Sequence, residues 1–284
     1  MKKILYLLVI PTLALTGCSN KISLEETERI GEEIKNTDVN YNAISDLKVK
    51  YVASAKVEGT RNTRVVDNKQ DESSTLAVSQ RFKYIHMVAK MNTNDGVEQE
   101  KDITESETWI YMKKKMLYKV KRDVSKGTET KRYTKIEKYS EAINTFATEY
   151  NKNMADAVTN AKGDLFNLSD NVNKYIDSKQ EGKFTCAVSS YSSGSGNLRY
   201  VCSLKFDQYE SGNLMLSGVG TATGKWNKFL LKNFAFALTL TETDGTNKNN
   251  LKLNVGVTAK VSKFFIPTYP NLNSYAYMSQ TSFK

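Results

Sequence analysis

The sequence predicts an α+β protein, mostly antiparallel β, in which one strongly curved sheet wraps around two or three helices. Long stretches of the chain alternate apolar and polar residues at period two, which is typical of strands with one buried face. Between them lies a stretch with the period of a helix. Strands with one apolar face must cover it, and helices are the available cover. Two smaller sheets are the alternative.

The first half of the chain predicts four or five strands. Apolar residues alternate with polar ones from 46 to 58, and a second strand runs from Leu76 to about Met91 after a polar, loop-like stretch at 61–72. Residues 104–112 and 116–122 flank three lysines and predict a hairpin. A fifth strand is expected near Tyr133.

The period changes at Ser140 and predicts helices. Apolar residues from Ile143 to Ala161 recur at the spacing of one helix face, so we expect a helix of about 22 residues that stops at Gly163. A second helix follows with Ser169 as its N-cap, and a short helix between Ser23 and Asn36 precedes the sheet.

Beyond Gly182 the chain returns to period two and predicts five more strands, the last ending near Val261. The expected organisation is a signal peptide at 1–17, a lipidated cysteine with tether and short helix at 18–44, a single β-rich domain at 45–276 with a helical insertion at 140–178, and a tail at 277–284.

The N-terminal segment predicts the location of the protein. Lys2 and Lys3 precede an apolar run at 4–13 that is too short to cross a bilayer, as in a signal peptide. The residues from Leu15 to Cys18 resemble the lipobox of bacterial lipoproteins. That resemblance implies that Cys18 is lipidated, that the leader is cleaved before it, and that the mature protein is anchored on the extracytoplasmic face of the cell membrane. An ordinary signal peptide is the alternative.

The charge of the chain suits an anionic surface. The net charge of +10 falls to +8 when residues 1–17, with two lysines and no acid, are removed. Lys113, Lys114 and Lys115 lie in the densest basic stretch and could meet anionic lipid or a wall polymer. A charged edge hairpin that resists aggregation explains them equally well. Nucleic acid is not an expected partner outside the cell.

Two cysteines remain once Cys18 is lipidated. Cys186 and Cys202 flank a Ser/Gly stretch, and a hairpin centred on Gly194 pairs them directly. Disulfides persist outside the cytoplasm, so we expect a cross-strand disulfide, with two buried thiols as the alternative. No ligand quartet for zinc accompanies them.

No pattern indicates catalysis. His86 is the only histidine, and no sequence pattern brings a nucleophile and a carboxylate to it. Gly218 and Gly220 resemble a phosphate loop, but no helix follows. The acids between Glu98 and Glu107 alternate too irregularly for a glycosidase pair. We therefore expect a protein that is not an enzyme and needs no cofactor or metal.

The order of these elements resembles the lipid-carrying lipoproteins with the outer-membrane lipoprotein carrier-like fold. The stretch from Trp109 to Met112, three lysines, and then Met116 to Tyr118 resembles their aromatic hairpin, and Phe264 to Pro267 leading to Tyr275 resembles their strand-Pro-Tyr ending. The resemblance implies a half-barrel that bends around helices and holds an acyl chain. It carries over no catalytic residue.

A hydrophobic cavity is therefore expected between the sheet and the helix at 143–161. The predicted function is to bind or transfer a lipid or hydrophobic ligand there, and the alternative is a surface interaction or adhesion lipoprotein with no internal ligand. An envelope hydrolase is the third and weakest hypothesis, because the sequence shows no nucleophile or metal site for it. Methionine and aromatic residues line adaptable pockets but also fill ordinary cores. The expected lining includes Tyr84, Met112, Tyr118, Phe146 and Met154.

Overall fold

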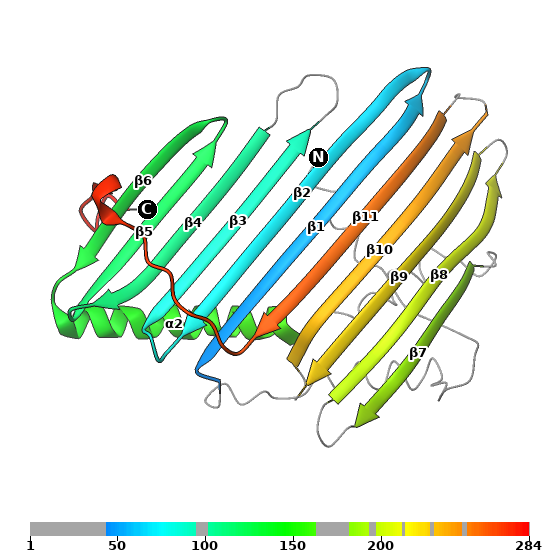
Figure 1. The fold of residues 1–284 in the computed structure, drawn as a ribbon. Coiled ribbons are helices and arrows are strands. Elements are labelled where there is room, and N and C mark those ends of the chain that lie inside the picture. Colours follow the sequence, from blue (N-terminus) through cyan, green and yellow to red (C-terminus); the bar gives the residue numbers. More distant parts are fainter. Residues whose placement is uncertain are drawn as a thin grey trace.

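In the computed structural model the chain forms one open, twisted sheet (Figure 1). The structure describes residues 44–94, 102–162, 182–192, 197–211, 214–227, 230–245 and 249–283. Within them the strand order is β12-β6-β5-β4-β3-β2-β1-β11-β10-β9-β8-β7, antiparallel throughout except that β12 pairs parallel with β6. The strands are β1 (Asp46–Arg61), β2 (Arg64–Ser79), β3 (Tyr84–Asn94), β4 (Asp102–Lys113), β5 (Met116–Ser125), β6 (Thr128–Ile136), β7 (Gly182–Ser192), β8 (Asn197–Ser211), β9 (Leu214–Asn227), β10 (Leu230–Asp244), β11 (Asn249–Ser262) and β12 (Ala276–Tyr277).

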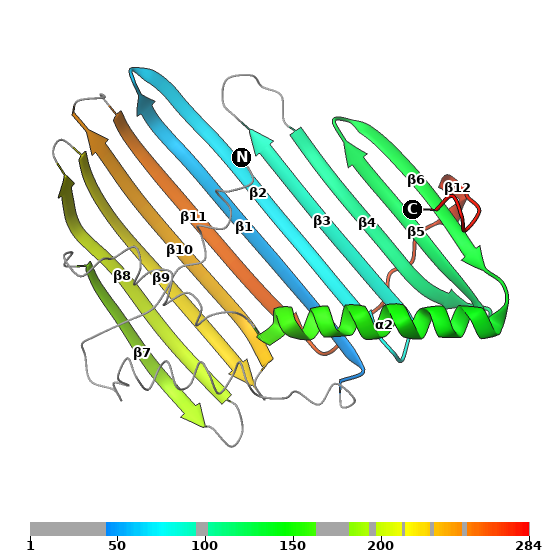
Figure 2. The same ribbon diagram turned by 180° about the vertical axis from the view of Figure 1, so that it is seen from behind.

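The predicted curved sheet or half-barrel around two or three helices is wrong. The sheet does not close, and α2 (Tyr139–Lys162) is the single α-helix of the described residues, lying across one face (Figure 2). The reason is that strands β3 and β4 are buried on both sides. Ile85 and Ile110 pack beneath α2, whereas their neighbours Tyr84 and Tyr111 pack on the opposite face. Strands that are covered on both faces have no need to curl around one core.

The helix predicted from Ser140 is confirmed as α2. Its apolar stripe packs Phe146, Met154 and Val158 against the sheet, where all three are buried together with Leu47. No described helix combines the length and the apolar character that a membrane span requires. The helices expected at 23–36 and after Ser169 lie outside the described residues.

Residues 263–275, which we call the C-terminal strap, run across part of the opposite face (Figure 1). Phe265 of the strap is buried against Tyr84 and Tyr111 in a second apolar cluster. The Tyr84 hydroxyl donates a hydrogen bond of 2.7 Å to the carbonyl of Thr268. The ring of Tyr269 meets the Tyr84 and Tyr111 rings edge-on, so the strap is held by both packing and polar contacts.

The predicted loop at 61–72 and the single strand from Leu76 to Met91 are wrong. Residues 64–79 form β2, and a turn at 80–83 separates it from β3. The first part of β2 is mostly exposed, because it extends beyond the core, and therefore needs no apolar alternation. The turn contains no proline or glycine; it is held by a hydrogen bond of 3.0 Å from the Phe82 amide to the Ser79 hydroxyl.

Candidate functional site

The five residues predicted to line one cavity are divided between the two faces of the sheet. Met112, Phe146 and Met154 belong to the core beneath α2, where Phe146 is 1% and Met154 3% exposed. Tyr84 and Tyr118 belong to the cluster beneath the strap. Alternation of side chains along each strand causes this separation. The structure therefore brings three of the five together, in a packed core, and not the whole set.

A different pocket, of about 280 Å³, lies between the sheet and the strap. Strands β1, β2 and β3 form its floor, and the strap residues Phe265, Ile266 and Thr268 lie along its side. The floor residues are Lys48, Lys50, Ser73, Ser74, Thr75, Ala77, Tyr84, His86, Val88 and Lys90.

Strand register explains why this floor is hollow. Lys48 lies opposite Ala77, and Ala77 opposite His86. In the next row on the same face Lys50 lies opposite Thr75, which is in turn opposite Val88. The central strand β2 thus carries small side chains between longer ones on β1 and β3. Because opposed side chains in a sheet are nearest neighbours, short residues on the middle strand leave a trough.

Lysine side chains give this trough a positive charge. Within the described part of the chain, Lys48 and Lys50 form no ion pair with a carboxylate, whereas Lys90 lies 2.8 Å from Glu105. The His86 ring stacks on Trp109 with a centroid separation of 4.9 Å. These features leave two lysine ammonium groups available to an anionic ligand.

His86 faces a carboxylate, and its burial favours the neutral imidazole. Its Nε2 lies 2.8 Å from Glu107 Oε1. Burial lowers the pKa of His86, and this effect outweighs the hydrogen bond with Glu107, which favours the charged form. Because a carboxylate only accepts, the neutral imidazole donates its Nε2 hydrogen to Glu107. His86 therefore lines the pocket as a neutral side chain held by Glu107 and not as a cation.

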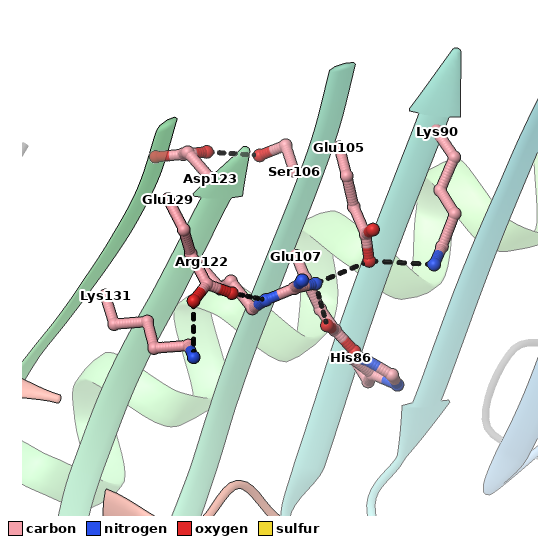
Figure 3. Close-up of polar contacts among 9 residues, drawn as sticks. All are labelled: His86, Lys90, Glu105, Ser106, Glu107, Arg122, Asp123, Glu129 and Lys131. Carbon is pink, nitrogen blue, oxygen red and sulfur yellow. Dashed lines mark hydrogen bonds and ion pairs between the residues drawn. The ribbon is translucent and has the colours of Figure 1, made fainter. Parts of the chain in front are cut away.

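A charge network on the neighbouring strands neutralises the acids beside the pocket (Figure 3). Arg122 lies 2.7 Å from Glu105, 3.6 Å from Glu107 and 2.6 Å from Glu129. Burial opposes ionisation of Glu105, but hydrogen bonds from Lys90 and Arg122 outweigh it, so the pKa of Glu105 is lowered. Each of these glutamates thus has a basic partner within the sheet.

The pocket offers polar and apolar groups that can bind a ligand. Ammonium and hydroxyl groups can hold an anionic head, while Ala77, Val88 and Phe265 provide apolar surface. In the described ranges no cluster of three or more histidine, cysteine or acidic residues could hold a metal ion. In the sequence, the spacing of Lys48 and Lys50 on one strand was only a weak signal for a binding site. The strap residues lie too far along the chain to be associated with these lysines from the sequence.

The cysteine predictions stay open. Cys18 lies outside the described residues. The backbones of β7 and β8 pair Cys186 directly with Cys202, the register that the spacing predicted. Their side chains are not among those that the structure describes, so the disulfide is still a prediction.

Comparison with known proteins assigns no family. No family model and no curated protein matches the chain. A DUF1329 family protein from Desulfovibrio piger is 10% identical, with 84% of this chain and 91% of that chain covered, at a TM-score of 0.14. The translocator domain of the autotransporter NalP from Neisseria meningitidis is 6% identical, with 83% and 93% covered, at a TM-score of 0.16. The transport unit of the autotransporter AIDA-I from Escherichia coli is 7% identical, with 84% and 97% covered, at a TM-score of 0.16. Likenesses at these scores carry no argument, and the function has to be argued from the site.

Proposed function

We propose that this protein is a lipid-anchored extracytoplasmic lipoprotein that binds an amphiphilic ligand without catalysis. The anchor is Cys18, on the strength of the leader and the lipobox-like residues before it. The observation that carries the binding function is the pocket beneath the strap, in which Lys48 and Lys50, without an ion pair to any described carboxylate, lie beside apolar surface.

The size of the pocket limits what it holds. Ligand pockets commonly start at about 300 Å³, and this one is about 280 Å³. It suits a polar head and the adjoining part of an acyl chain, not a whole lipid. A phosphate or carboxylate would lie between Lys48 and Lys50, where charge-assisted hydrogen bonds are strongest, and the chain would run against Val88 and Phe265.

This proposal moves the ligand from the helix side of the sheet to the strap side. The space beneath α2 is occupied by Phe146 and Met154, which are almost fully buried. Beneath the strap, by contrast, the small residues of β2 leave room. A surface interaction lipoprotein with no internal ligand is the alternative, and the experiment below separates the two.

The test compares two soluble probes of equal chain length, lysophosphatidylglycerol and an uncharged monoacylglycerol, by calorimetry below their micelle concentrations. We expect the anionic probe to bind at least tenfold more tightly, and the double variant Lys48→Gln/Lys50→Gln to abolish that preference. The matched control is Arg61→Gln/Arg64→Gln, which removes the same charge at the far end of the strands. If neither probe binds, the surface interaction alternative replaces the proposal.

A blocking variant tests the position of the ligand. Thr75 is half-buried on the pocket floor, and Thr75→Phe fills the trough without entering either core. Both probes should then lose binding while the unfolding midpoint changes little. Unchanged binding in this variant would place the ligand elsewhere.

The anchor has its own test. Cys18→Ala should release the protein from a membrane fraction after a high-salt wash, because the acyl chains are lost. Retention through that wash would contradict lipidation at Cys18.

A further inference from the structure

One end of the sheet is built from connections that are both basic and aromatic. We call it the basal edge, and it is the lower end of β1 to β6 in Figure 1. Backbone hydrogen bonds hold neighbouring connections together there, from Gln80 to the Ser45 carbonyl at 2.8 Å and from Met112 to the Lys83 carbonyl at 3.0 Å. Its segments are residues 44–46, 80–83, 113–116, 137–139 and 263–266.

The basal edge has a strong excess of positive charge. Its two acids are both matched, since Asp46 lies 3.1 Å from Arg81 and Glu137 lies 2.5 Å from Lys135. The same segments contain six basic residues besides Lys263. They are Arg81, Lys83, Lys113, Lys114, Lys115 and Lys138.

Three of these lysines occupy backbone positions that favour other residues. Lys83, Lys114 and Lys115 have φ values of 48°, 50° and 66°, in the left-handed region that suits asparagine or glycine. A two-residue hairpin turn with positive φ at both positions prefers Asn-Gly, and the β4–β5 turn has two lysines instead. These turns therefore present lysine side chains at the end of the sheet, although Lys126 at the far end has a similar φ of 48°.

Exposed apolar side chains lie among the charges. Phe264 is 67% and Ile266 78% exposed, and Tyr139 is 52% exposed. The Lys115 ammonium lies 5.9 Å from the centroid of the Tyr139 ring. The Arg81 guanidinium lies 5.8 Å from that of Phe264. Cations beside exposed aromatic and aliphatic groups are typical of surfaces that enter the head-group region of a bilayer.

The far ends of the same strands look different. The two described turns there, at 61–64 and 125–128, carry three basic residues but no apolar or aromatic one. The exposed apolar residues at that end, Val65 and Ile103, are aliphatic, so cations beside exposed aromatic rings are what distinguish the basal edge from the described far ends.

We propose that the basal edge docks on an anionic lipid bilayer, with its lysines on the lipid phosphates and Phe264 and Ile266 in the interface. The described chain begins on this edge at Ile44, so the edge is the part of the described structure that follows Cys18 in the sequence. This inference rests on the membrane location proposed above and not on the strap pocket.

Fluorescence quenching tests the contact. Phe264→Trp is introduced into the full chain, which is mixed with vesicles of phosphatidylcholine and phosphatidylglycerol whose acyl chains are brominated. The matched control is Val65→Trp, since Val65 is 79% exposed at the far end of the strands. Because Trp109 and Trp226 fluoresce in every variant, quenching is compared with that of the wild type, and we expect bromine to quench the added tryptophan at position 264 and not the one at 65. Equal quenching at both positions, or none at 264, would overturn the proposal.

A charge comparison provides a second readout should Phe264→Trp disturb folding. In the Cys18→Ala chain, Lys113→Gln/Lys114→Gln/Lys115→Gln should weaken partition onto the same vesicles, unbrominated, by about fivefold per lysine at low salt, or roughly a hundredfold. The control Arg61→Gln/Arg64→Gln/Lys126→Gln removes equal charge at the far end and should change partition only a few-fold. Equal losses would mean that net charge, not this edge, attracts the protein.

The two proposals can fail separately. The triple lysine variant should still bind lysophosphatidylglycerol in the absence of vesicles, because Lys48 and Lys50 are untouched. If this variant no longer docks on vesicles but still binds the soluble probe, the lysines of the basal edge are needed for docking and the inference is supported. Docking by a wild-type chain that binds neither soluble probe would remove the pocket function and leave the inference standing.

Discussion

Substitution of Phe146 decides whether the space beneath α2 is core or cavity. The Phe146 side chain is 1% exposed and packs in the cluster that joins α2 to the sheet. Its ring lies 6.0 Å from that of Tyr150, and the Lys83 ammonium lies 5.8 Å from its centroid. Truncating a phenylalanine in such a position costs about 3–5 kcal/mol, from lost burial and the cavity left behind.

Two variants give opposite steric changes at this one site. Phe146→Ala should lower the free energy of unfolding by about 3–5 kcal/mol, which is roughly 6–20 °C in melting temperature for a domain of this size. Phe146→Trp should cost about 1–3 kcal/mol, because a filled core cannot accept the larger ring without strain. Phe264→Ala is the control and should cost less than about 0.5 kcal/mol, since Phe264 is exposed.

The assay is urea unfolding followed by circular dichroism, with the slope of the transition compared between variants. Equal slopes with shifted midpoints would show that stability alone has changed. The reasoning would be refuted if both Phe146 variants left the midpoint within about 0.5 kcal/mol of the wild type and altered lipid uptake instead. That result would restore a ligand cavity beneath the helix.

Three further predictions concern the sheet. Thiol labelling of the denatured, non-reduced mature protein should modify neither Cys186 nor Cys202, because a disulfide closing about 15 residues stabilises by roughly 3 kcal/mol; labelling of both would exclude the bridge. Gly59→Ala should destabilise by about 1–3 kcal/mol, since φ is 137° there and an added Cβ would meet the Asn250 carbonyl, whereas Gly245→Ala meets open space; equal midpoints would contradict this. Arg122→Gln should lower stability most near pH 7, because Arg122 helps to lower the pKa of Glu105 and Glu129. That stabilisation exists above about pH 4.3 and is lost as the pH falls through the lowered pKa values of the folded state. A difference from the wild type that did not shrink below about pH 4 would count against this reasoning.

Local pattern was enough for several elements. The spacing of apolar residues from Ile143 to Ala161 predicted α2, because a helix stripe is set by neighbours three and four positions away. Local pattern also predicted the hairpin of β4 and β5 around the lysines and the backbone pairing of Cys186 with Cys202, and the strand register confirms both. The turn at 80–83 was missed, since its residues give none of the usual turn signals.

The candidate site could hardly be predicted from the sequence, because the tertiary structure brings its residues together. Lys48, Thr75 and His86 come from three strands, and their row arrangement depends on register between segments that only folding aligns. Phe265 lies between 179 and 217 positions further along the chain than these residues, so no local spacing could associate it with them.

What the sequence by itself determined is the identity of most strands, the position of α2 and the lipobox-like residues at Cys18. Only the tertiary structure decided that the sheet stays open and that Tyr84 and Ile85 serve two different cores. The physical reason is that alternation shows that a strand has two faces but not what will cover each of them. Here the covers are α2 and the strap, and the strap is chosen by contacts between residues far apart in sequence.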